Sequence, residues 1–282
     1  MKEILIALCF DDYYALNGAM VLYSIAKNIK RNVKIRAYII DGGIRKETKE
    51  KFKKILRRNL DIVWLNPDLS IFDNLPLSSW TTKVAHSRLL LPYIIQDDIK
   101  KIIYLDSDIL VVGDLLRLWK IPLNDCFLAA FQDSTYTNVY KKVNSKVLVD
   151  AGMNRLSPYF NSGFLMIDVS LWKKYDILRK YIEILGNIGN QFTHCNQDAM
   201  NIIFNNKWKQ IKKEIQYDNN THICSLKKME KITGRISLSI LLVKLLDFQN
   251  ANILKKNYSI TMSTVQNGFL KKSLYYGKLK YS

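Results

Sequence analysis

The stretch KIIYLDSDILVVGD, from Lys101 to Asp114, contains a short apolar run that ends in two carboxylates. Ile102 to Leu105 has the length and character of a buried strand, and Asp106 and Asp108 follow it two positions apart. In extended backbone this spacing places both side chains on the same side of the chain. Mg²⁺ and Mn²⁺ prefer hard oxygen ligands and keep open positions for phosphate oxygens. The stretch therefore predicts a metal-diphosphate site, although two surface aspartates in a turn would leave the same pattern.

Around this stretch, short β-branched apolar runs alternate with longer amphipathic segments over the first two hundred residues. Such alternation is typical of a largely parallel sheet covered by helices, so we predict an α/β fold. The expected strands are Glu3 to Phe10, Lys34 to Asp41, Leu60 to Leu65, Lys101 to Leu105, Phe127 to Phe131 and Gly163 to Val169. The expected helices are Ala15 to Lys30, Arg45 to Asn59, Lys83 to Gln96 and Leu171 to Leu185. The pattern fades after Asn206, which divides a core domain, residues 1–206, from a basic extension, residues 207–282.

Acidic residues follow several of the predicted strands. In open α/β sheets, ligands bind beyond the carboxyl ends of the strands, so these side chains are candidates for a site. They are Asp11, Asp12, Asp41, Asp106, Asp108 and Asp133. A row of carboxylates on one rim of a basic protein suggests a bound cation or sugar hydroxyls.

The net charge of +18 is concentrated at the C-terminal end, where residues 207–282 contain 15 Lys and Arg against 4 Asp and Glu. Basic and aromatic residues alternate there, as in Lys271 to Tyr276, and Leu238 to Phe248 is apolar. Two interpretations remain open. The extension either lies on the anionic inner leaflet of a membrane or forms a solvated basic face on the core.

Composition excludes other protein classes. With 48% hydrophobic and 24% charged residues, the chain resembles an ordinary soluble globular protein. The apolar N-terminal run is stopped by Asp11 and Asp12, so we expect a buried strand rather than a signal peptide. No apolar stretch approaches the roughly 20 residues that span a bilayer. Four cysteines without a CxxC pair suggest reduced thiols, and we expect a cytoplasmic protein.

Several further motifs stand in a fixed order along the chain. They are Phe10-Asp11-Asp12-Tyr13-Tyr14, His86-Ser87-Arg88, the stretch from Lys101 to Asp114, Tyr159-Phe160-Asn161-Ser162-Gly163-Phe164 and Asn196-Gln197-Asp198. In order and spacing they resemble glycosyltransferase family 8, the retaining galactosyl- and glucosyltransferases of bacterial surface polysaccharide assembly, over roughly residues 3–217. The resemblance implies a GT-A-type nucleotide-sugar-binding fold, with a mixed and mostly parallel sheet flanked by helices.

The resemblance also implies the ligands. The donor would be UDP-glucose or UDP-galactose, and the acceptor a saccharide, which in surface polysaccharide synthesis can be lipid-linked at the inner membrane leaflet. Mn²⁺ or Mg²⁺ would be held by Asp106 and Asp108. The implied function is transfer of a hexose to a growing glycan.

Position by position, the resemblance places Asp11 and Tyr14 at the uridine and Arg88 at the diphosphate or the donor sugar. The donor-binding candidates are Asp11, Asp12, Tyr14, Arg88, Asp106, Ser107, Asn161, Ser162 and Gly163. The catalytic candidates are Gln197, Asn196 and Asp133. Gln197 would stand near the anomeric carbon, and because an amide is a poor nucleophile this favours same-face attack over double displacement.

The chain departs from the family pattern at several positions. Tyr13 stands in place of a polar residue, and Asn196 stands where the family more often has Asp, although it could serve as a helix N-cap. A downstream HxGxxKPW-like block, which supplies a third metal ligand in the family, is absent, and His222 lacks the residues that should follow it. Three explanations remain: a diverged tail that coordinates the metal differently, a truncated or frame-shifted product, or a sugar-nucleotide-binding homologue without transfer activity.

Other functions fit the sequence less well. A phosphatase with a DxDx[TV] nucleophile would need Thr or Val where Leu110 stands. A nucleic-acid-binding module is disfavoured because the positive charge lies in the tail, whereas carboxylates surround the expected cleft, so we expect no nucleic acid partner. Neither GxxxxGK[ST] nor GxGxxG occurs, which argues against P-loop and Rossmann sites.

Overall fold

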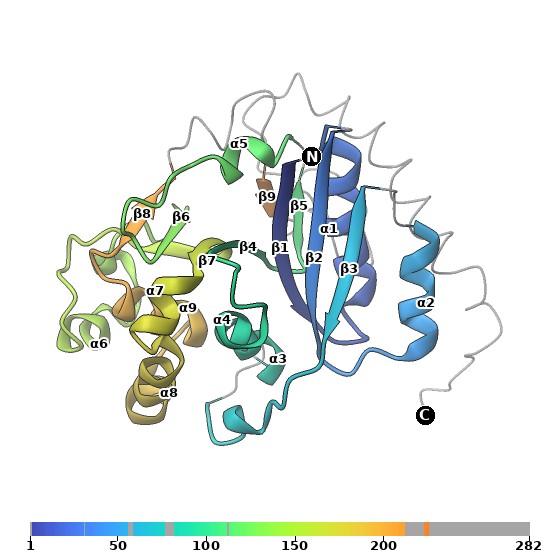
Figure 1. Ribbon diagram of the computed structural model, residues 1–282. Coiled ribbons are helices and arrows are strands. Elements are labelled where there is room, and N and C mark those ends of the chain that lie inside the picture. The colour runs from blue at the N-terminus through green and yellow to red at the C-terminus, as the bar shows by residue number, and fades with distance from the viewer. Residues whose placement is uncertain are drawn as a thin grey trace, which may run out of the picture.

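The computed structural model of the chain describes residues 2–30, 32–55, 59–76, 82–111, 113–211 and 223–225. A seven-stranded sheet with the order β3-β2-β1-β4-β7-β6-β8 forms its centre (Figure 1). Its strands are β1 (Lys2–Phe10), β2 (Val33–Asp41), β3 (Leu60–Leu65), β4 (Lys101–Leu105), β6 (Leu128–Gln132), β7 (Phe160–Asp168) and β8 (Trp208–Gln210). A second, two-stranded sheet pairs β5 (Ile109–Val111) with β9 (Ile223–Ser225).

The main sheet is mixed. β1 pairs in parallel with β2 and β4, β2 with β3, and β6 with β8, whereas β7 runs antiparallel to both β4 and β6. The predicted α/β class with a mixed, mostly parallel sheet is confirmed. Because β7 is reversed, its first residues lie at the edge where β4 and β6 end. Asp106, Asp133 and Asn161, which are far apart in sequence, are therefore brought to one edge.

Helices cover both faces of the sheet, as Figure 1 shows. The α-helices are α1 (Ala15–Asn28), α2 (Lys46–Ile55), α3 (Lys83–His86), α4 (Leu91–Ile94), α5 (Leu116–Trp119), α6 (Ser145–Asp150), α7 (Val169–Lys174), α8 (Ile177–Ile188) and α9 (Cys195–Ile203). The 3₁₀ helices are η1 (Ser70–Phe72), η2 (Ser87–Leu90), η3 (Val139–Lys141) and η4 (Gly189–Gln191). Side chains alternate along β1: Ile6 and Leu8 join the core cluster with α1, whereas Ala7 joins the cluster that includes Trp172 of α7.

Two predicted helices are interrupted. The segment predicted as one helix from Lys83 to Gln96 consists of α3, the 3₁₀ helix η2 and α4. Arg88 lies in η2 and is only 5% exposed. The segment predicted from Leu171 to Leu185 divides into α7 and α8 at Asp176, which adopts a left-handed φ of 46° and caps α8 through its carboxylate. A residue in this conformation ends one helix while its side chain begins the next.

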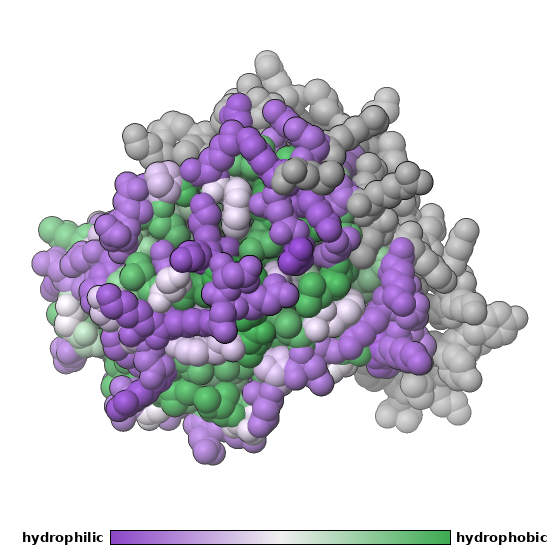
Figure 2. All heavy atoms as spheres, in the orientation of Figure 1, coloured by the Kyte–Doolittle hydropathy of each residue, from purple (hydrophilic) through white to green (hydrophobic). Residues whose placement is uncertain are grey.

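The division at residue 206 stays a prediction, since only 207–211 and 223–225 of the extension are described. β8 nevertheless joins the main sheet from beyond that boundary. His222 and the stretches Leu238 to Phe248 and Lys271 to Tyr276 lie outside the described residues. Among the residues that are described, none belongs to a helix of the length and apolarity that a bilayer crossing requires. Figure 2 shows hydrophilic residues over much of one face, with hydrophobic side chains visible between them.

Candidate functional site

The candidate site lies where β1 and β4, neighbours in the sheet but not in sequence, both end. At such a switch point the chain leaves adjacent strands in opposite directions and opens a crevice for a ligand. Asp11 follows β1 and accepts a hydrogen bond from the backbone N–H of Tyr14 at 3.0 Å, which shapes the turn into α1. The pKa of Tyr14 is raised by burial and then by the nearby charges of Tyr13, Asp11 and Asp108. Because β1 and β4 pair in parallel, the turns that follow them lie at the same edge of the sheet.

Asp106, the first residue after β4, is held by three contacts. Its Oδ1 accepts a hydrogen bond from the hydroxyl of Tyr104 at 2.7 Å and lies 3.0 Å from Nη2 of Arg88. Its backbone N–H donates to the carbonyl of Gly163 on β7 at 2.8 Å. The side chain is still 31% exposed. The carboxylate is thus fixed from inside the protein but remains open to solvent.

Arg88 reaches this carboxylate from a buried position. It donates to the carbonyls of Ala85 at 2.9 Å and Ser162 at 3.0 Å, and its guanidinium lies 4.5 Å from the centre of the Tyr104 ring. Burial by itself would lower the pKa of Arg88, but the Asp106 carboxylate opposes this and the net pKa is raised, so the side chain is charged. The contacts of Arg88 are with the protein itself, and its predicted contact with a diphosphate stays a prediction.

The backbone after Asp106 differs from the expectation. Ser107 and Asp108 form a turn between β4 and β5, so the prediction of extended backbone from Asp106 to Asp108 is wrong. The reason is that β5 leaves the main sheet to pair with β9, and the chain must bend to reach it. Both Ser107 and Asp108 are half-buried.

Two carboxylates are a partial set of ligands for a divalent cation. No group of three His, Cys, Asp or Glu side chains that could hold a metal occurs within the described part of the chain. Asp106 and Asp108 offer the hard oxygens that Mg²⁺ and Mn²⁺ prefer, and such cations commonly complete their coordination with substrate phosphates and water. The chemistry of these two side chains therefore suits a cation that takes its remaining ligands from a bound molecule and water.

Gly163 permits the close approach of β7 to this carboxylate. A Cβ atom at this position would lie 3.0 Å from Oδ2 of Asp106 and 3.1 Å from Oδ1 of Asn161. A larger residue would have to displace one of the two side chains. Gly163, a predicted donor-binding residue, thus leaves room for two other predicted site residues, Asp106 and Asn161.

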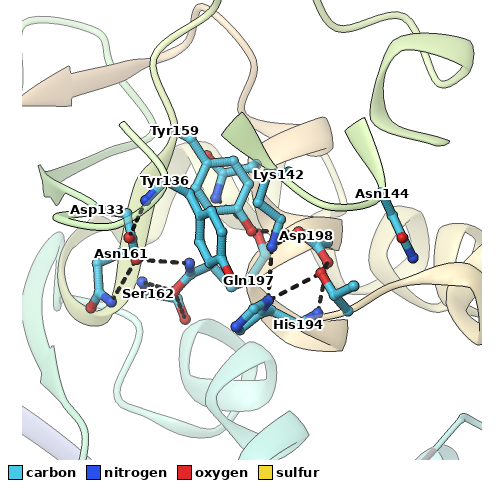
Figure 3. A network of polar contacts seen from close by, with 12 residues as sticks. Asp133, Tyr136, Lys142, Asn144, Tyr159, Asn161, Ser162, His194, Gln197 and Asp198 are labelled. Carbon is cyan, nitrogen blue, oxygen red and sulfur yellow. Dashed lines mark hydrogen bonds and ion pairs between the residues drawn. The ribbon is translucent and has the colours of Figure 1, made fainter. Parts of the chain in front are cut away.

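A second polar cluster surrounds Asp133, which follows β6 (Figure 3). Its Oδ2 accepts hydrogen bonds from Nδ2 of Asn161 and Nε2 of Gln197, each at 3.2 Å. Its Oδ1 accepts from the backbone N–H groups of Thr135 and Tyr136, each at 2.8 Å. Burial would raise the pKa of Asp133, but these hydrogen bonds lower it overall, so the carboxylate stays ionised.

Gln197 links this cluster to the first. Its Oε1 accepts a hydrogen bond from the backbone N–H of Ser162 at 3.0 Å, and the Ser162 carbonyl accepts from Arg88. One turn later in α9, Asn201 exchanges hydrogen bonds with both the N–H and the carbonyl of Phe160. Helix α9 is thereby fastened to the beginning of β7, and the two clusters share one rigid support.

Two predicted site residues, Asn196 and Asp12, have other partners in the structure, and their roles stay predictions. Asn196 accepts a hydrogen bond from the hydroxyl of Tyr181 at 2.6 Å, and that hydroxyl lies 2.7 Å from Nδ1 of the buried His86. The N-cap of α9 is His194, so Asn196 does not cap the helix. Asp12 accepts from the backbone and the side chain of Arg45.

Several residues that the structure joins to the site had no predicted role. Tyr104 donates a hydrogen bond to Asp106. Because side chains two positions apart in a strand lie on the same face, the sequence could have indicated this contact. Lys142 is buried against Asp198 at 3.0 Å and lies 2.8 Å from Nδ1 of His194 (Figure 3). Asp198 belongs to a quoted motif, but nothing in the sequence distinguishes Lys142 from the surface lysines.

Comparison with known proteins gives consistent matches. A family model described as "Glycosyl transferase family 8" matches residues 5–239. General stress protein A of Bacillus subtilis is 30% identical over 207 residues, which cover 72% of this chain and 70% of that protein. Lipopolysaccharide 1,3-galactosyltransferase of Salmonella typhimurium is 27% identical over 171 residues, 60% of this chain and 50% of that protein. A crystal structure of the galactosyltransferase LgtC in complex with donor and acceptor sugar analogs is similar with a TM-score of 0.66 and 26% identity, covering 75% of this chain and 74% of that one.

Proposed function

The chain belongs to glycosyltransferase family 8, and we propose that it is a retaining hexosyltransferase that moves glucose or galactose from a UDP-sugar to a saccharide acceptor. One observation carries the proposal. Asp133, Asn161 and Gln197 come from three separate segments, and they converge in hydrogen bonds at the edge of the sheet where Asp106 also lies. A carboxylate and two amides in contact form a surface suited to reading sugar hydroxyls.

Similar proteins support the substrate class. The Salmonella relative is named as a lipopolysaccharide galactosyltransferase, and the similar LgtC structure contains donor and acceptor sugar analogs. The chain matches 70% and 50% of the lengths of the two curated relatives, so acceptor and linkage are proposals taken from part of each protein. We infer an acceptor of cell-surface polysaccharide or glycoconjugate synthesis, lipid-linked at the cytoplasmic face of the inner membrane.

The donor is proposed to lie along the edge of the sheet. Asp11 and Tyr14 would contact the uridine, because they form the turn after β1. Asp106, Ser107 and Asp108 would meet the diphosphate, with Mn²⁺ or Mg²⁺ held by the two carboxylates. When bound, such a cation supplies positive charge that stabilises the departing diphosphate.

The residues of the chain would orient the reaction rather than exchange protons. Arg88 neutralises Asp106 from inside the protein and keeps its carboxylate in one position. The ionised Asp133 would accept hydrogen bonds from sugar hydroxyls, while the Gln197 amide would lie beside the anomeric carbon. The acceptor hydroxyl would attack from the face that the leaving group vacates, and its proton would pass to a departing phosphate oxygen. Asn196 would contribute through Tyr181 rather than by direct contact.

Two measurements on the full chain test the proposal. Calorimetric titration with UDP, UDP-glucose and UDP-galactose, with and without Mn²⁺, should show nucleotide binding that requires the cation and is lost in Asp106→Ala. NMR of the product should show an anomeric carbon of unchanged configuration. UDP binding that is indifferent to both Mn²⁺ and Asp106→Ala would reject the site, and binding without transfer to any saccharide would identify a sugar-nucleotide-binding homologue instead.

A further inference from the structure

Lys142 is a charged side chain in the interior of the protein, only 1% exposed. It follows η3 in the loop between β6 and β7, and its ammonium lies 3.0 Å from Oδ1 of Asp198 and 2.8 Å from Nδ1 of His194. The rings of Tyr136 and Tyr159 lie 4.5 Å and 4.9 Å from the same nitrogen. Its partners come from the loop, from the residue before β7 and from the start of α9, so one ammonium joins three segments (Figure 3).

Such a pair is poorly explained by stability alone. Removing two charges from water is unfavourable, and replacing a buried ion pair by apolar residues of similar volume is often neutral or stabilising. Asp198 also accepts hydrogen bonds from the hydroxyl of Tyr159 and from the backbone N–H of His194. All these contacts have defined directions, which an apolar cluster would lack. The arrangement therefore fixes geometry rather than adding to the hydrophobic core.

The pair of Lys142 and Asp198 is connected to Asp133 and Gln197, the residues proposed to contact the donor sugar. The backbone N–H of Tyr136, whose ring packs on the Lys142 ammonium, donates to Asp133. At the other end, Asp198 is adjacent in α9 to Gln197, whose amide contacts Asp133 at 3.2 Å. The ammonium is thus connected to Asp133 through Tyr136, and to Gln197 through the neighbouring Asp198.

We propose that Lys142 is a positioning residue for the donor sugar: its ammonium ties the loop after β6 to the start of α9 and thereby sets the contact between Asp133 and Gln197. This rests on the proposed function, in which both residues face the sugar. The uridine and diphosphate groups would bind near Asp11 and Asp106, which have no contact with Lys142. Loss of the ammonium should therefore impair use of the sugar while leaving binding of UDP nearly unchanged.

The test compares Lys142→Met, Lys142→Arg and a control, Lys146→Met, in the full chain. Lys146 is an exposed lysine of α6 that pairs with Asp150, so its loss removes a charge close in sequence without touching the cluster. Affinities for UDP and for the UDP-sugar that the wild type uses are measured with Mn²⁺, together with kcat for sugar transfer or hydrolysis. Folding is monitored by thermal melting.

In Lys142→Met, kcat is expected to fall by about 30-fold while the Kd for UDP changes by less than about threefold, because a small misplacement of orienting groups suffices for such a loss. Lys142→Arg retains the charge and should recover most of kcat, and Lys146→Met should match the wild type. Equal losses of UDP affinity and kcat in Lys142→Met, or no loss at all, would overturn the proposal.

A second variant, Tyr159→Phe, tests the same proposal by kinetics and by crystallography. Should Lys142→Met fail to fold, Tyr159→Phe removes one hydrogen bond to Asp198, and about a fivefold loss of kcat at unchanged UDP affinity is expected. Wild-type kcat in that variant overturns the proposal. A wild type that uses no UDP-sugar rejects the proposed function instead, and a crystal structure of Tyr159→Phe then decides the inference. An Asp133 to Gln197 contact unchanged at 3.2 Å in Tyr159→Phe counts against it.

Discussion

Two buried pairs of opposite charge lie at the same edge of the sheet, Arg88 with Asp106 and Lys142 with Asp198. In each, a cation nitrogen and a carboxylate oxygen are 3.0 Å apart. They differ in access to solvent. The Asp106 side chain is 31% exposed although Arg88 behind it is 6% exposed, whereas Lys142 and Asp198 are 1% and 2% exposed.

The difference separates two ways of using a buried charge. An open pair presents one face of its carboxylate to a ligand, and the cation behind it holds that carboxylate in place. A closed pair can meet no ligand, and it acts only by holding segments together. We therefore expect loss of the open pair to remove ligand binding, and loss of the closed pair to misplace groups that still bind.

Asp106→Asn breaks the open pair and should have the largest effect. It removes the charge that balances the buried Arg88 and one of the two carboxylates proposed to hold a cation. A loss of about 10³-fold in turnover of the UDP-sugar is expected, the magnitude typical when one electrostatic contact to a developing charge is removed. Initial rates at saturating Mn²⁺ measure it.

The matched control is Asp97→Asn, an exposed carboxylate that pairs with Lys173 on the surface. It should retain wild-type turnover. If Asp106→Asn lies within tenfold of the wild type, then the open pair has no special role and the contrast with the closed pair fails.

The open pair also has a neutral neighbour, His86, whose protonation should destabilise the folded chain. His86 is fully buried, and burial first and the charge of Arg88 second lower its pKa from 6.5 to about 4. Between these values the unfolded chain takes up a proton that the folded chain does not, so the free energy of unfolding falls as the pH falls. The depressed pKa corresponds to a loss of about 3 kcal/mol between pH 6.5 and pH 4.

Urea unfolding of the wild type and His86→Gln at several pH values measures this contribution. Glutamine keeps a polar partner for the hydroxyl of Tyr181 and does not titrate. The variant should lose less stability than the wild type across this range, even though carboxylates elsewhere destabilise both proteins in acid. If the free energy of unfolding falls equally with pH in both proteins, then protonation of His86 does not destabilise the folded chain. Arg88 would then tolerate a second positive charge beside it.

Gly163→Ala sharpens the comparison by narrowing the space beside the open pair. The added Cβ would lie 3.0 Å from Oδ2 of Asp106, so the carboxylate must shift by a few tenths of an ångström. Since Arg88 and Tyr104 hold its other oxygen, a loss of about tenfold in turnover is expected. Gly186→Ala in α8, where nothing lies within 4 Å of the added atom, should keep wild-type turnover. Equal kinetics in the two alanine variants would count against a tightly placed Asp106.

The fold was largely accessible from the sequence because buried strands depend on local composition. The apolar runs that end at Phe10, Asp41 and Leu105 each predicted a strand that ends at the same residue. The breaks in the helices were not accessible. Asp176 adopts a left-handed conformation and Arg88 lies in a 3₁₀ helix. Both features depend on packing against distant segments, which helix propensities of single residues do not describe.

The candidate site was accessible only in part, because the same local signal has several physical causes. Asp41, like Asp106, follows a buried strand, yet Asp41 accepts hydrogen bonds from two backbone N–H groups of its own turn and pairs with Lys49. The partner of each carboxylate is decided by segments far away in sequence. The closed pair is the extreme case, since a lysine in a polar loop is usually exposed and only the folded chain shows Lys142 enclosed.

An exposed pair provides the baseline for both buried ones. Asp12 follows β1 and pairs with Arg45 at 2.6 Å, but the Arg45 side chain is 74% exposed. Solvent screens such a pair, so Asp12→Asn should change the free energy of unfolding by about 0.5 kcal/mol at most. Because the carboxylate is directed to Arg45, we expect the affinity for UDP to stay within twofold of the wild type, as measured by titration calorimetry. A tenfold loss of UDP affinity without a loss of stability would instead support the donor-binding role that the family resemblance implies for Asp12. It would also show that a pair exposed to solvent can exchange its cation for a ligand.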